Sequence, residues 1–184
     1  FDEPLSTLDA KLRDEMRHEI RQLAKATGIT ALYVTHDQAE AFAVSDRVAV
    51  VMEGQIAHFA PPPELYRRPA RLDVARFVGR MSELRAERVS ETKVRIGADE
   101  LEVTAAPEAT QDVLLGVRPE DVQFADTGLA GRVARATFLG AHTELEVETE
   151  WGLVRVDAAE PRAEGETVHL RVGRGRLYKK PASS

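Results

Sequence analysis

The sequence predicts two parts with different folds, an α/β segment in residues 1–80 and an all-β domain in residues 81–180. Two observations lead to this division. Up to about residue 80, apolar residues recur at helical spacing or form short continuous runs, as in helices that alternate with buried parallel strands. Beyond that point, they alternate with polar neighbours in short runs separated by turn residues, which favours a small β-barrel or sandwich.

The first helix is expected from about residue 8 to residue 27. Its apolar residues recur every three or four positions, which places them on one helix face, and charged residues fill the opposite face. Gly28 follows at the point where a left-handed cap would end the helix. The apolar positions are Leu8, Leu12, Met16, Ile20 and Leu23.

A strand, a helix and a hairpin are expected next. Residues 29–36 (ITALYVTH) form a short apolar run rich in β-branched residues, which predicts a strand buried on both faces. Asp37 could cap a helix through AEAFAVS. RVAVVM predicts a further buried strand, which turns at Glu53 and Gly54 into QIAHF. Short helices in PELYRRP and LDVARFVG complete the α/β segment.

The later strands are recognised by their period of two. Turn residues at positions 97–99, 126–128, 151–152 and 164–165 separate them. The inward-facing residues are expected to be Val94 with Ile96, Leu101 with Val103, Leu145 with Val147, Val154 with Val156, and Val168 with Leu170 and Val172.

Composition excludes several kinds of site and partner. The 184 residues include no cysteine, so disulfides, thiolate zinc sites and a cysteine nucleophile are excluded. The net charge is −6 and neither half is basic, so nucleic acid is not an expected partner. No apolar run approaches the roughly eighteen residues of a membrane span. His18, His58, His142 and His169 lack metal-ligand spacing.

Two adjacent carboxylates stand near the start of the chain. If Phe1 ends a buried parallel strand, Asp2 and Glu3 emerge at its carboxyl end, where α/β sheets bind ligands. Two acidic groups in such a place favour a cation, and Mg²⁺ with a phosphate ligand is the usual one. The alternative is that the pair caps the following helix.

Residues 1–79 resemble the second half of the nucleotide-binding domain of ABC transporters. The resemblance rests on DEPLSTLDAKLR and, after one helix and one strand, VTHDQAEAFAVSDRVAVVMEGQI. It implies a remnant of a P-loop NTPase fold with ATP and Mg²⁺ as cofactors. Phosphoryl transfer suits these residues, because it depends mainly on positioned charge around the phosphate.

The resemblance also implies roles for single residues. Asp2 corresponds to the Walker B aspartate, which holds Mg²⁺ through water, and Glu3 to the catalytic glutamate that polarises the attacking water. Ser6 and Asp9 bound the D-loop, which crosses to the nucleotide of a partner subunit. His36 corresponds to the switch histidine that contacts the γ-phosphate. Taken alone, His36 would more often be a partly buried structural histidine.

Several motifs of that domain are not found in the sequence. It contains no GxxxxGK[ST] loop, no LSGGQ-like signature and no glutamine loop, which in the family precede the position of Asp2. The chain also begins without Met. We therefore expect a C-terminal fragment that, by itself, neither binds ATP tightly nor hydrolyses it.

The second part resembles the accessory β domain called TOBE, an OB-like fold. The resemblance covers residues 81–177 and rests on GVRPED at residues 116–121 and on Leu139, Gly140 and Thr143. These residues suit turns and strand ends, so a structural role is favoured over direct ligand binding. The short length favours the importers for polyamines, ferric iron or thiamine over those for sugars.

Together, the resemblances imply an ATP-hydrolysing subunit of an ABC importer, peripheral at the cytoplasmic face of the inner or plasma membrane. The implied partners are a second ATPase subunit in a homodimer, transmembrane permease subunits and, through them, an extracytoplasmic solute-binding protein. The alternative is a non-catalytic module in which the TOBE domain binds a small ligand or a regulatory partner.

Overall fold

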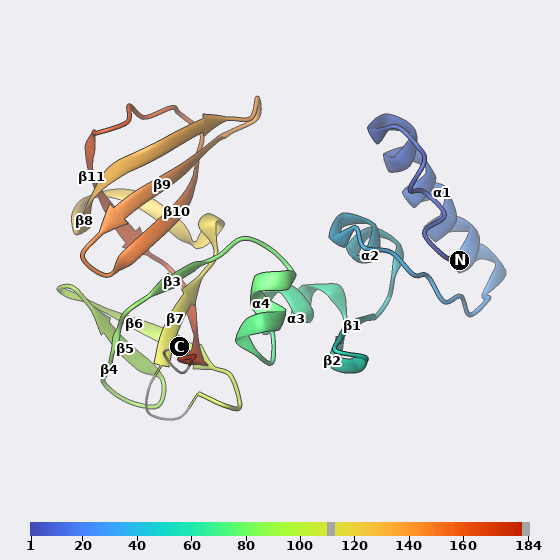
Figure 1. The fold of residues 1–184 in the computed structure, drawn as a ribbon, viewed down its shortest axis with the longest axis horizontal. Coiled ribbons are helices and arrows are strands. Elements are labelled where there is room, and N and C mark those ends of the chain that lie inside the picture. The colour runs from blue at the N-terminus through green and yellow to red at the C-terminus, as the bar shows by residue number, and fades with distance from the viewer. Residues whose placement is uncertain (110–112, 182–184) are drawn as a thin grey trace. The chain divides into compact units, whose positions relative to one another are not determined.

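The computed structural model describes residues 1–109 and 113–181 (Figure 1). The chain divides into two compact units, Phe1–Ala70 and Arg71–Ser184.

The division between the units falls earlier than the expected boundary at residues 80 and 81. Helix α4 (Leu72–Phe77) belongs to the second unit, because its buried side chains join an apolar cluster of that unit. The cluster consists of Leu72, Ala75, Met81, Ala106 and Tyr178. The short helix expected in LDVARFVG is confirmed, whereas the sheet against which it packs is not a local property of the sequence.

Helix α1 (Ala10–Thr27) forms as expected. The side chain of Asp9 caps its first turn by accepting a hydrogen bond from the Leu12 N–H at 3.0 Å. Gly28 ends it with φ of 66°, a conformation that glycine adopts at little cost. The predicted helix and its end at Gly28 are therefore confirmed, whereas it begins at Ala10, slightly after the expected start.

The rest of the first unit contains two short helices and a hairpin. Helix α2 (Gln38–Val44) is capped by Asp37, as predicted. Strands β1 (Val48–Met52) and β2 (Gln55–Ala60) pair antiparallel, and α3 (Pro62–Arg67) follows. The sequence predicted that RVAVVM, which contains β1, is a buried strand. This is wrong, because only Val50 of β1 is buried and Val51 is 61% exposed.

Residues 29–36 do not form the predicted buried strand. Their structure is irregular except for one isolated parallel bridge between Val34 and Asp2. Leu32 is 80% exposed and Val34 48% exposed. A parallel strand becomes regular and buried only between neighbours, and in the described part of the chain the backbone of this segment pairs with Phe1 and Glu3 on one side only. The β-branched composition of residues 29–36 is therefore not enough to make them a regular strand.

The second unit contains two sheets with the orders β10-β9-β8-β11 and β3-β7-β12-β6-β5-β4. Among the described pairs all are antiparallel except β12 with β6. A short 3₁₀ helix, η1 (Pro119–Asp121), precedes β8. The strands are β3 (Ser82–Leu84), β4 (Glu87–Arg88), β5 (Lys93–Ile96), β6 (Asp99–Ala105), β7 (Val113–Val117), β8 (Val122–Phe138), β9 (Thr143–Thr149), β10 (Gly152–Ala158), β11 (Thr167–Val172) and β12 (Gly175–Lys179).

Both sheets contribute to one apolar core. Alternate residues of β5, β9, β10 and β11 are buried, as the period of two predicted. The leucines at its centre are fully enclosed, so the core accounts for the stability of this unit. They are Leu84, Leu115, Leu145, Leu170 and Leu177. The all-β prediction for this part of the chain is confirmed.

Strand β8 runs through a predicted turn. Residues 126–128 were expected to separate two strands, but the backbone stays extended there. The pairing with β11 shifts instead, so that Phe124 lies opposite Leu170 while Ala130 lies opposite His169. Gly128 permits this irregularity, because a Cβ at that position would lie 2.5 Å from the Leu170 carbonyl oxygen. The turn signal thus marks a bulge.

Candidate functional site

The first residues of the chain run parallel to residues 32–34. The Val34 N–H donates to the Phe1 carbonyl and the Glu3 N–H to the Val34 carbonyl, both at 2.9 Å. Glu3 then turns the chain with φ of 45°, which is uncommon for a residue with a side chain. Asp2 and Glu3 thus lie at a short parallel pairing, but the expected buried strand is replaced by one isolated bridge at Asp2, and Phe1 is 60% exposed.

The alternative role for this acidic pair is wrong. Neither Asp2 nor Glu3 caps the following helix, because Asp9 provides the capping oxygen of α1. Asp9 is thus a structural residue in this chain, and its expected place near a nucleotide stays a prediction.

Glu3 and His36 are in direct contact. The His36 Nδ1 lies 2.9 Å from the Glu3 Oε1, and the two side chains are 75% and 47% exposed, respectively. The hydrogen bond and the charge of Glu3 raise the pKa of His36 above its ordinary value of 6.5. The pair brings a carboxylate and an imidazole together at the surface, where both can reach a ligand.

Ser6 lies beside this pair. Its N–H and its hydroxyl both donate to the Glu3 carbonyl, at 3.2 Å and 2.9 Å. A small cavity of about 50 Å³ joins Glu3, Ser6 and His36 to Arg13, Thr35 and Glu40. A space of this size holds one or two waters and no nucleotide. Three of the five expected site residues therefore meet at one place.

The acidic residues fit a hydrated Mg²⁺ by their chemistry. Carboxylate oxygens are the protein ligands that Mg²⁺ prefers, and it usually keeps several of its waters. Asp2 is exposed, and its carboxylate makes no hydrogen bond or ion pair with any residue that the structure describes. It is therefore accessible to an ion or to the water around one.

Sequence reasoning missed Glu40, which is 3% exposed. Its Oε2 accepts hydrogen bonds from the Thr35 hydroxyl at 2.8 Å and from the Tyr33 hydroxyl at 3.1 Å. Burial and this carboxylate raise the pKa of Tyr33 to about 12. A glutamate in the first turn of a predicted helix is ordinary, so no local signal distinguished it.

The TOBE-like motif in the second unit has structural contacts. Arg118 is 9% exposed, and its guanidinium donates to the carbonyls of Gly79 and Arg80 at 2.7 Å and 3.0 Å. Gly116 packs closely on Met81 and Tyr178. These contacts agree with the structural role that the sequence favoured.

A larger cavity of about 380 Å³ lies in the second unit. It is bordered by the guanidinium groups of four arginines, each paired with a carboxylate. Arg76 pairs with Glu83, and Arg135 and Arg155 both pair with Glu146. Arg80, the fourth arginine, pairs with Glu144 and Asp157. The lining thus combines fixed positive and negative charge.

His142 lies beside two carboxylates, which its sequence context did not indicate. Its Nε2 is 3.9 Å from both Glu144 Oε1 and Asp157 Oδ1. However, Arg80 already binds Glu144 at 3.0 Å and Asp157 at 2.9 Å. A cation between these carboxylates would have to displace the guanidinium, so we assign no metal here.

In the part of the chain that the structure describes, no helix is long and apolar enough to cross a membrane. Residues 115–178 match the family model of the TOBE domain.

Curated relatives match most of the chain. An Fe(3+) ions import ATP-binding protein FbpC of Agrobacterium fabrum is 45% identical over 159 residues, which cover 83% of this chain and 45% of that protein. The protein of the same name from Brucella abortus is 43% identical, over 86% of this chain and 47% of its own. That from Fusobacterium nucleatum is 35% identical over 190 residues, which cover 96% of this chain and 51% of its own.

The chain spans about half the length of these relatives. The matches agree with the two resemblances drawn from sequence motifs, to the ABC nucleotide-binding domain in residues 1–79 and to the TOBE domain in the second part of the chain. The chain therefore carries a TOBE domain in its C-terminal part and is homologous, over most of its length, to ATP-binding subunits of ABC importers.

Proposed function

We propose that this chain supplies the water-activating part of the nucleotide site of an ATP-hydrolysing ABC importer subunit. The observation that carries the proposal is the contact between Glu3 and His36. It places a carboxylate that can orient water beside an imidazole that can donate a hydrogen bond to a phosphate oxygen. The relatives are named ATP-binding proteins for Fe(3+) import, which supports a nucleotide site in the parent protein. Phe1–Ala70 is then a remnant of a P-loop NTPase domain.

Each residue of the site has a role in this proposal. Glu3 orients the attacking water, and His36 contacts the γ-phosphate. Asp2 holds Mg²⁺ through water, and the bound ion would offset the negative charge of the phosphates. Ser6 and Asp9 lie towards the nucleotide of a second subunit. Ser6 contacts the backbone of Glu3, which supports a link between the two sites of a dimer.

The remaining parts of a nucleotide site would come from other residues. A phosphate-binding loop and a signature motif are needed to hold ATP, and this sequence contains neither. We therefore propose that residues 1–184 alone do not hydrolyse ATP. The partners are a second ATPase subunit, membrane permease subunits and an extracytoplasmic solute-binding protein. The subunit acts at the cytoplasmic face of the membrane.

Ferric iron is the proposed solute. The relatives described above are named for Fe(3+) import, which favours iron over the polyamines and thiamine that domain length alone left open.

The test is a chimera in which this chain replaces the matching half of the Agrobacterium fabrum relative. Glu3→Gln keeps the size of the side chain but removes its charge, so ATP turnover should fall by about 10²-fold or more. Glu15→Gln, an exposed residue of α1, is the matched control and should leave turnover unchanged. Full turnover in Glu3→Gln would overturn the catalytic assignment.

A second candidate function is small-anion binding at the cavity in the second unit, where an anion would have to replace the carboxylates that pair with the four arginines. In this case, the TOBE domain would be a binding module and the first unit an appendage. Calorimetric titration of the whole chain with sulfate should then show saturable binding that Arg135→Met weakens. A flat titration would count against this function.

A further inference from the structure

Glu40 is a buried carboxylate at the border of the candidate site. Its side chain is 4% exposed, and it lies in the first turn of α2. Burying a carboxylate costs more than burying an apolar side chain of the same size, unless its oxygens are well paired. Such a residue therefore indicates a specific need for its hydrogen bonds.

The hydrogen bonds of Glu40 fix both neighbours of His36. The Thr35 hydroxyl donates to Glu40 Oε2 at 2.8 Å and accepts from the Asp37 N–H at 3.0 Å. Asp37 in turn accepts from the Glu40 N–H at 3.0 Å as the cap of α2. The backbone on either side of His36 is thus closed into a ring of hydrogen bonds, and the imidazole is left to project towards Glu3.

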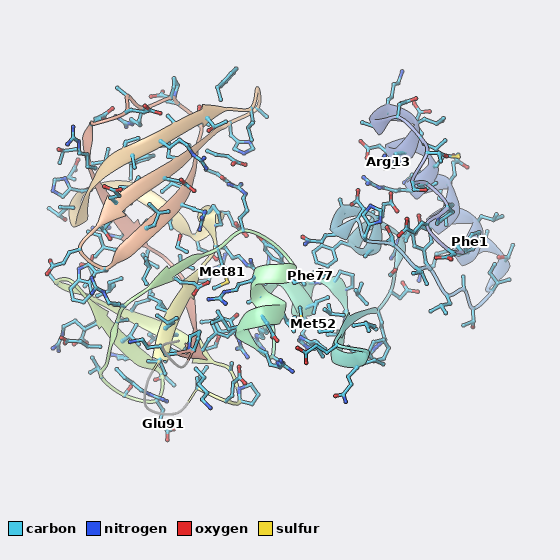
Figure 2. All side chains as sticks on the ribbon, viewed as in Figure 1. Phe1, Arg13, Met52, Phe77, Met81 and Glu91 are labelled. Carbon is cyan, nitrogen blue, oxygen red and sulfur yellow. The ribbon has the colours of Figure 1, made fainter. Side chains whose placement is uncertain are left out.

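Glu40 also contacts helix α1, which follows Ser6 in the chain. Arg13 of α1, labelled in Figure 2, places its Nε 3.7 Å from Glu40 Oε1, and its terminal nitrogen donates to the Leu8 carbonyl at 2.9 Å. Arg17 of the same helix approaches Glu40 at 3.8 Å and donates to Asp37 at 3.1 Å. One carboxylate therefore joins α1, α2 and the segment that carries His36.

We propose that Glu40 is a positioning residue that holds His36 against Glu3, acting through the Thr35 hydroxyl. The inference rests on the proposed function, because it assigns Glu40 a task only if His36 and Glu3 act together. Glu40 lines the small cavity beside Glu3 and His36 but is assigned no contact with the nucleotide. Its part is to fix the direction of the imidazole.

The experiment uses the chain as it is and measures the pKa of His36 by NMR titration of its ring nitrogens. Thr35→Val removes the hydroxyl at constant shape and charge, so a change in pKa reports position and not a lost charge. Glu3→Gln gives the value without the contact. Thr35→Ser keeps a hydroxyl and should behave as the unchanged chain. Thr27→Val, whose hydroxyl bonds the Leu23 carbonyl at 2.7 Å, is the matched control.

We expect Thr35→Val to lower the pKa of His36 to the value in Glu3→Gln, and to have no further effect in the Glu3→Gln background. A merely structural role would lower the thermal midpoint of Thr35→Val but leave the pKa of His36 unchanged, and this would overturn the inference. A Glu3→Gln variant with an unchanged pKa would also overturn it. If Thr35→Val does not fold, Tyr33→Phe removes the other hydroxyl on Glu40 and takes its place.

None of these measurements involves ATP. Loss of the positioning effect would therefore leave the proposed hydrolysis to be judged by the chimera, and an inactive chimera would leave the NMR result intact. The two conclusions can fail separately.

Discussion

The Glu3 Oε1 and the His36 Nδ1 lie 2.9 Å apart, although 33 residues separate them in the sequence. The first residue is fixed by its parallel pairing with Val34, and the second by the hydrogen bonds around Thr35. Backbone pairing and a buried carboxylate together thus produce an exposed pair that could act on a ligand.

This contact predicts a pH-dependent contribution to stability. The pKa of His36 is raised in the folded chain, chiefly by the hydrogen bond to Glu3. The stabilisation is therefore complete below the pKa of the unfolded chain and is lost as pH rises through the raised folded pKa. Glu3→Gln should be less stable than the unchanged chain between about pH 5 and 6.5 and equally stable well above that range. Urea unfolding across this range measures the difference.

Added salt provides the control for the same prediction. The pair is exposed, so salt should reduce the difference in unfolding free energy at low pH. A difference that stays constant with pH would show that Glu3 stabilises the chain by some other contact.

Asp9 should contribute to the stability of α1 through its cap. Asp9→Ala leaves the Leu12 N–H without its partner, and loss of such a cap costs about 1 kcal/mol. Glu15→Ala also removes an exposed carboxylate from this region and serves as the control. The helical signal in circular dichroism during urea unfolding measures both. Equal midpoints for the two variants would contradict the assignment of the cap.

The sequence predicted the elements whose signals are local. The first helix has an amphipathic pattern and a glycine after it, and both act within a few residues. Alternation in β9 and β10 likewise predicted their buried faces. In contrast, residues 29–36 have a strand-like composition, but a strand depends on neighbours that composition does not supply.

Some residues of the candidate site could likewise be predicted from the sequence and others could not. Asp2, Glu3 and His36 were identified because a motif resemblance marked them. Glu40 was missed, because a glutamate becomes unusual only when the tertiary structure buries it. Glu3, which contacts His36, has a positive φ that no pattern in the sequence indicates.

Gly116 should not tolerate a side chain. A Cβ at this position would lie 2.7 Å from the ring of Tyr178 and also press on Met81. The methionine can move, but Tyr178 is buried, so Gly116→Ala should destabilise the chain by about 1–3 kcal/mol. At Gly173 the nearest atom, the Asp121 carbonyl oxygen, is 3.4 Å away, and Gly173→Ala should be nearly neutral. Thermal unfolding measures the stability of both variants. Similar unfolding midpoints for Gly116→Ala and Gly173→Ala would contradict the packing argument.

Arg118 should stabilise the second unit by its backbone contacts and not by ligand binding. Its guanidinium donates to the carbonyls of Gly79 and Arg80, and Arg118→Met keeps much of the apolar stem but removes both bonds. Hydrogen bonds from charged groups contribute about 1.5–3 kcal/mol, so the free energy of unfolding should fall by about that amount. Arg171→Met changes an exposed arginine of β11 and should shift it by less than about 0.5 kcal/mol. If urea unfolding showed no loss of stability in Arg118→Met, the structural role of Arg118 would be contradicted, and ligand binding by GVRPED would become the better explanation.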